Sequence, residues 1–99
     1  MTYKEDPKFT ELKDRFQFLS NEVNKLRSLY SKNTTNVMVI DMLILSLVTF
    51  DDHMKLMVSN FPDYYVDSKQ MIDKMFEAND NYIKALNNQK LGMVSYGSN

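Results

Sequence analysis

Two groups of ionisable residues have types and spacings that could support chemistry. His53, the only histidine, follows two aspartates, and three carboxylates recur at intervals of four and three residues further along the chain. Carboxylate oxygens are the ligands that a hard cation such as Mg²⁺ prefers, and two antiparallel helices could bring these groups together. The candidate ligands of such a metal-dependent helical hydrolase are Asp52, His53, Asp73, Glu77 and Asp80.

The same residues also fit a simpler interpretation, in which they lie on solvated helix faces. Small helical nucleotide pyrophosphohydrolases use a two-helix carboxylate cluster, but their paired Glu-Glu-x-x-Glu and Glu-x-x-Asp elements are absent from this sequence. Asp73 and Asp80 each have a lysine four residues away, as neighbours on an exposed helix face do. This interpretation predicts no bound metal and no cofactor.

Nucleophilic catalysis has little support in the sequence. His53 beside an aspartate could act as a general base. However, the chain has no cysteine, and no serine stands in a recognised nucleophile motif. Both glycines, Gly92 and Gly97, lie in the last eight residues, which excludes glycine-rich phosphate-binding loops. We therefore predict that the chain is not an enzyme and has no catalytic residues.

The amino-acid composition makes further classes of protein unlikely. The 99 residues make one domain, and 12 basic against 13 acidic residues give a net charge of −1, without the positive charge typical of nucleic-acid-binding proteins. Without cysteine there are neither disulfides nor thiolate metal sites, so a cytoplasmic location is expected. Ten lysines, two arginines and ten asparagines are typical of AT-rich coding sequences, such as those of many bacteriophages.

The stretch from Val37 to Phe50 determines how the rest of the chain must be arranged. Only Asp41, Ser46 and Thr49 interrupt its apolar run. As a helix its 14 residues span about 21 Å, against about 30 Å of hydrocarbon in a bilayer, so it is too short to cross a membrane. A helix that is apolar on nearly every face must be covered on two or more sides.

Periodicity and end signals predict three helices, at about 7–32, 35–61 and 67–90, in an all-α domain over residues 1–91. The first begins at Asp6-Pro7, a good N-cap and first-turn pair. Thr34 or Thr35 is the expected cap of the second, after a polar connection. Because the heptad register continues unbroken, one long helix from Pro7 to Phe61 is an open alternative. Residues 92–99 are expected to be a flexible tail.

Three antiparallel helices give the central helix one partner on each side, which leaves part of its apolar surface uncovered. The simplest cover is the same helix of a second copy, because a two-fold contact lets one patch bury itself. Asp41, inside the apolar run, is expected either to pair with Arg15 or Arg27 or to face outward. The predicted oligomer interface consists of Val39, Leu43, Leu45, Val48, Phe50, Met54 and Met57.

These patterns favour a non-enzymatic role for the chain. The function expected is that of a small helical protein-interaction protein, an accessory, assembly or regulatory factor that acts as a homo-oligomer. Its expected partners are itself and another protein, with nucleic acid unlikely and no membrane. Two alternatives stay open, namely the metal-dependent hydrolase described above and a weak nucleic-acid-binding accessory protein.

Overall fold

The computed structural model of the chain describes residues 2–97, and only the backbone of residues 94–97. Within this range the protein is all-helical, as predicted, and no strand is present. A 3-10 turn, η1 (Tyr3–Glu5), is followed by helices α1 (Pro7–Lys32), α2 (Val37–Asn60), α3 (Pro62–Asp67) and α4 (Lys69–Gly97). None of the described helices combines the length and hydropathy needed to cross a bilayer.

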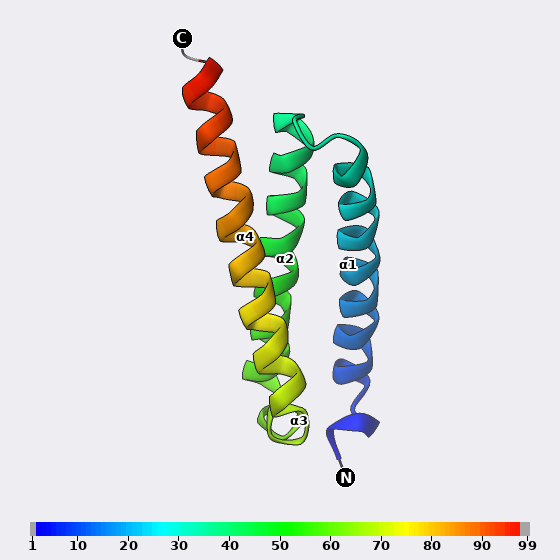
Figure 1. Cartoon of the computed structure of the whole chain (residues 1–99). Helices are drawn as coiled ribbons and strands as arrows, with labels where there is room; N and C mark the ends of the chain where they lie inside the picture. Colours follow the sequence, from blue (N-terminus) through cyan, green and yellow to red (C-terminus); the bar gives the residue numbers. More distant parts are fainter. Residues whose placement is uncertain (1, 98–99) are drawn as a thin grey trace.

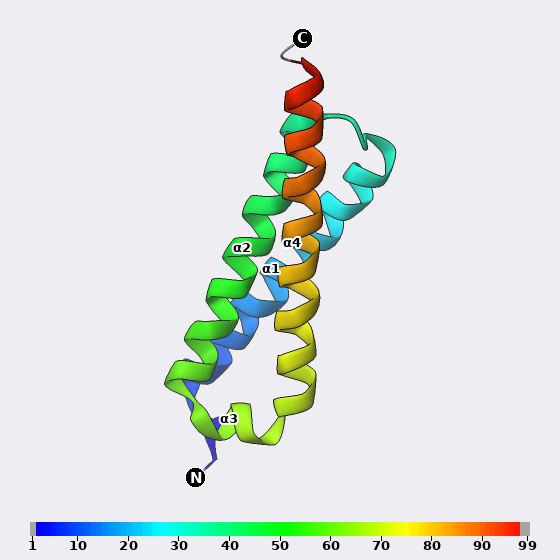
Figure 2. The same cartoon turned by 60° about the vertical axis from the view of Figure 1, so that its left-hand side comes forward.

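The three long helices form a rod of 61 × 20 × 17 Å. Helix α2 packs against both α1 and α4, and it runs antiparallel to each of them (Figure 1). The short helix α3 carries the chain sideways, so that α4 begins away from the end of α2 (Figure 2). At the opposite end, α4 extends past the turn between α1 and α2 in both views.

Local signals explain where α1 begins and ends. The Asp6 carboxylate accepts a hydrogen bond from the Lys8 amide at 2.9 Å, and Pro7 occupies the first turn, where its missing N–H costs nothing. The helix ends at Lys32, where the Asn33 amide donates to the Tyr30 carbonyl. The chain then reverses direction, so the alternative of one continuous helix from Pro7 to Phe61 is wrong.

The cap of α2 is Asn36, not Thr34 or Thr35. Its side-chain oxygen accepts hydrogen bonds from the amides of Met38 at 3.0 Å and Val39 at 3.3 Å. An asparagine directly before the first helical residue is as good a cap as threonine or better, and here it shortens the predicted helix by two residues.

The C-terminal third differs from the prediction at two places. Residues 62–66, predicted as a connection, are helical, because they belong to α3, which has Pro62 in its first turn. Helix α4 then begins at Lys69 and continues to Gly97, so the backbone of residues 92–97 is helical where a loose tail was predicted. The remaining two residues of that predicted tail, Ser98 and Asn99, lie outside the described residues.

The core takes one apolar stripe from each outer helix. The stripe of α1 that packs into it consists of Phe9, Leu12, Phe16, Leu19, Val23, Leu26 and Tyr30. The stripe of α4 consists of the fully buried Ile72 and Leu86 and the half-buried Met75, Phe76, Tyr82 and Ile83. Helix α2 supplies most of the fully buried side chains, because it alone is covered from two sides.

We expect Asn36→Ala to lower the free energy of unfolding by about 1 kcal/mol, because two amides at the start of α2 lose their acceptor. Thr35→Ala is the matched control. It removes the cap predicted from sequence but no hydrogen bond of the described structure, so its effect should stay within about 0.5 kcal/mol. Urea denaturation followed by circular dichroism measures both, and equal losses would contradict the assignment of the cap.

Candidate binding surfaces

The five candidate metal ligands are not brought together. Asp52 is exposed on the side of α2 that faces away from α1 and α4, whereas His53 points towards α1. Asp73, Glu77 and Asp80 are exposed on α4. Among residues 2–97, no three His, Asp or Glu side chains are grouped so that they could hold a metal ion. The alternative in which these groups converge on a cation therefore has no support in this arrangement. Asp52 and His53 are adjacent on one helix, and adjacent helical positions point about 100° apart.

Two of these residues make hydrogen bonds that link helices. The His53 Nε2–H donates to the Leu12 carbonyl of α1 at 2.7 Å, so this nitrogen carries the proton and serves as a strut between α1 and α2. Asp73 accepts a hydrogen bond from the Tyr65 hydroxyl at 2.8 Å, which joins α3 to the first turns of α4. Both side chains therefore have structural partners.

Polar contacts attach the C-terminal half of α4 to the start of α2. Asp41 forms an ion pair with Lys90 at 2.6 Å, and its side chain is 48% exposed. It thus faces outward, and its partner is on α4, not the predicted Arg15 or Arg27. The neighbouring Gln89 donates to the Thr34 carbonyl at 2.7 Å and accepts from the Tyr30 hydroxyl, which holds α4 against the turn between α1 and α2.

One carboxylate lies inside the apolar core. Asp51 is only 5% exposed, and its Oδ2 is 3.2 Å from the Lys55 ammonium, a contact that raises the pKa of Lys55. Among the side chains of residues 2–93, its Oδ1 and the Asn79 Nδ2 of α4 are the buried atoms without a hydrogen-bond partner. The Asp51 oxygen is a hydrogen-bond acceptor and the Asn79 nitrogen is a donor. In the register that the Asp41–Lys90 pair sets between α2 and α4, Asp51 and Asn79 lie at about the same height along the two helices.

Most of the predicted oligomer interface is part of the chain's own core. Val39, Leu43, Phe50, Met54 and Met57 are all buried within the single chain, so their prediction as interface residues is wrong. The reason is that the two outer helices reach further around α2 than one heptad seam each. Of the seven predicted residues, only Leu45 and Val48 stay exposed, at 67% and 37%.

These two residues belong to a longer apolar surface. Three further exposed side chains of α2 extend it, and we call the set the outer stripe: Met38, Met42, Leu45, Val48 and Leu56. Met38, Met42, Leu45 and Leu56 follow helical spacing on the side opposite the buried face. Sequence reasoning missed Met38, Met42 and Leu56, although counting by threes and fours from Met38 would have found them.

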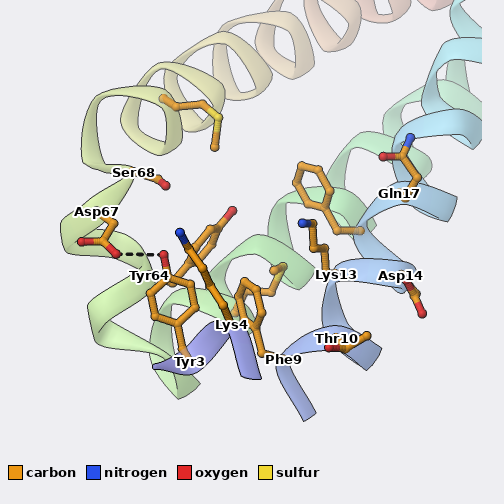
Figure 3. Close-up of a pocket in the computed structure, with 13 residues that line it drawn as sticks. Tyr3, Lys4, Phe9, Thr10, Lys13, Asp14, Gln17, Tyr64, Asp67 and Ser68 are labelled. Atoms are coloured by element: carbon orange, nitrogen blue, oxygen red, sulfur yellow. Dashed lines mark hydrogen bonds between the residues drawn. The ribbon is translucent and has the colours of Figure 1, made fainter. Parts of the chain in front are cut away.

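A second surface is an open groove of about 950 Å³ between the N-terminal half of α1 and the corner formed by α3 and α4. We call it the α1/α3 groove (Figure 3). Its apolar and aromatic lining comes from five elements and consists of Tyr3, Phe9, Phe16, Met57, Tyr64 and Met71. Its polar lining includes Lys4, Lys13, Asp14, Gln17 and Asp67. Nothing in the linear pattern indicated it, because α3 was not predicted.

Aromatic packing forms the closed end of this groove. The Phe9 ring is 5.2 Å from Phe61, 5.1 Å from Tyr64 and 4.9 Å from Tyr3, all in edge-to-face geometry. The Tyr3 hydroxyl donates to the Asp67 carboxylate at 2.9 Å (Figure 3), which ties the N-terminal turn to the end of α3. These contacts hold three separate elements around one apolar floor.

Three tyrosines at this end have perturbed acidity. Burial, and then the hydrogen bond to Asp67, raise the pKa of Tyr3. Burial raises the pKa of Tyr64, and the hydrogen bond to Asp73 is the main cause that raises the pKa of Tyr65. A raised tyrosine pKa means that the folded state favours the neutral phenol. The stabilisation is therefore complete below the ordinary value and is lost as the pH rises through the raised pKa.

Comparison with protein-family models, with curated protein sequences and with solved structures finds no match for this chain. The function of this chain must therefore be inferred from its two apolar surfaces and the charges beside them.

We expect Asp73→Asn to lower the pKa of Tyr65 towards its ordinary value of 10.0, because the phenolate then forms without a facing carboxylate. The matched control is Asp80→Asn, which removes another exposed carboxylate of α4 that contacts no tyrosine. The Tyr65 ring-carbon NMR shift, followed from neutral to alkaline pH, reports the titration. If Asp73→Asn leaves the titration curve of Tyr65 unchanged, the hydrogen bond to Asp73 is not the main cause of the raised pKa.

Proposed function

We propose that the protein is a small non-enzymatic interaction protein that self-associates through the outer stripe of α2 and works as an accessory or regulatory factor. The observation that carries this proposal is the exposure of the outer stripe on the most apolar helix. Met38 and Leu45 are 72% and 67% exposed. Several exposed apolar side chains on one face of a helix are typical of interaction sites.

A second copy of the chain fits the stripe well. Met38 and Leu56 lie near its two ends, with Leu45 close to the middle. If two α2 helices cross antiparallel about that middle, Met38 of each copy lies near Leu56 of the other, and the surface buries itself around a two-fold axis. The polar Thr49 and Asp52 interrupt the stripe, which keeps it less apolar than a permanent interface.

The size of the stripe indicates the strength of the contact. From Met38 to Leu56 it covers about 27 Å of a helix about 10 Å wide, so its footprint is about 270 Å². A standard protein interface buries about 800 Å² on each partner. The proposed dimer is therefore reversible and depends on concentration, unless side chains of α1 or α4 next to the stripe join it.

The first experiment is the measurement of mass by size-exclusion chromatography with light scattering over a wide concentration range. We expect a shift from 11.7 kDa towards twice that value. Leu45→Glu should raise the dissociation constant of the dimer by at least about tenfold, because a carboxylate would have to be buried in an apolar contact. Since Leu45 is exposed, the variant should fold normally.

The control for this experiment is Leu91→Glu, which makes the same change at a leucine that is 68% exposed on α4. This variant should show the same mass distribution as the unmodified chain. A chain that stays monomeric at every concentration would refute self-association, and an equal effect of the two substitutions would refute the placement of the contact on the outer stripe.

A further inference from the structure

The α1/α3 groove combines an apolar floor with two cationic side chains. Lys4 and Lys13 extend their ammonium groups over the floor, whereas the Asp14 carboxylate points away from it (Figure 3). No carboxylate of the described residues lies within ion-pair distance of either lysine. The other carboxylate of the lining, Asp67, accepts a hydrogen bond from the Tyr3 hydroxyl and keeps its negative charge, so two lysines face one carboxylate in the groove.

We propose that this groove binds an amphipathic helix of a partner protein, with apolar anchors on one face and acidic residues beside them. Two lysine ammonium groups beside an apolar surface are complementary to such a helix, because its anchors would cover the exposed Met71 and the half-buried Phe16 while its carboxylates pair with the lysines. A helix with basic flanks would meet two like charges and is disfavoured.

The shape of the groove also suits a helix. Helix α3 displaces the start of α4, so the space between α1 and α4 at this end is open and reaches down to Met57 of α2. A cavity of about 950 Å³ has the volume of about two turns of a helix about 10 Å across. A bound helix would thus contact α1 and α4 together and complete a four-helix arrangement at this end.

This inference is independent of the proposed self-association. The groove opens between α1 and α4, whereas the outer stripe lies on the face of α2 that points away from both helices. A single NMR sample can report on the two surfaces separately, because each of them contains methionines. Met57 and Met71 line the groove, and Met38 and Met42 belong to the outer stripe.

The experiment titrates the full chain, labelled with ¹³C at its methionine methyl groups, with two designed helical peptides. Both carry leucine and phenylalanine at the same helical spacing. One has glutamate beside these anchors and the other has lysine. We expect the glutamate peptide to shift the Met57 and Met71 signals while those of Met38 and Met42 stay unchanged. The lysine peptide should bind at least about tenfold more weakly, and the difference should shrink at high salt.

A charge reversal tests the role of the two lysines. Lys4→Glu combined with Lys13→Glu should weaken binding of the glutamate peptide by about tenfold and strengthen binding of the lysine peptide. Both lysines are exposed, so the fold should be unaffected. Lys74→Glu combined with Lys84→Glu makes the same change in net charge on exposed positions of α4 outside the groove, and it should leave the preference for the glutamate peptide intact.

Three results would overturn the proposal. The first is equal binding of the two peptides, or no binding, at salt concentrations where charges are not screened. The second is a response of Met57 and Met71 to dodecanoate but to neither peptide, which would assign the groove to a small anionic amphiphile. The third is loss of self-association in the Lys4→Glu, Lys13→Glu variant, which would identify the occupant as a second copy of this chain. Retained dimerisation together with lost peptide binding supports the proposal.

Discussion

The whole structure depends on the need to cover α2. This helix is apolar around almost its entire circumference, and water contact with that surface is unfavourable by about 25 cal/mol per Å². Helix α1 covers one side and α4 another, which forces the antiparallel path seen in Figure 1. Two helices cannot enclose a third, and the outer stripe is the part of α2 that they leave exposed.

Polar contacts at the two ends of the rod determine where α4 can lie. At one end Gln89 and Lys90 hold α4 against the turn between α1 and α2 and against Asp41. At the other end α3 displaces it, and the Tyr3–Asp67 hydrogen bond links the N-terminal turn to α3 across the opening. Helix α4 is thus fixed at one end and kept apart from α1 at the other. The α1/α3 groove is a consequence of this geometry.

Periodicity was enough to predict the three long helices, since apolar residues every three or four positions define a stripe without reference to any partner. What they could not give is the rotation of α2 relative to its neighbours. The oligomer interface predicted from the sequence includes Val39 and Phe50, but both are buried within the chain itself. The hydrogen bond of His53 to a backbone carbonyl depends on how α1 and α2 pack, which the sequence does not specify. Thr35 and Asn36 are both residue types that cap helices, so the sequence alone does not decide which of them is the cap.

The two proposed surfaces have different physical characters, which suits them to different partners. In the two proposals the outer stripe, which occupies one helix face, pairs with a copy of itself, whereas the groove, which is concave and carries Lys4 and Lys13, receives a different chain. A dimer closed through the outer stripe leaves both grooves open, because each groove lies on the side of its chain that faces away from the contact. Such a dimer holds two equivalent sites, and a partner with two suitably spaced helices would gain from effective concentration without any new contact.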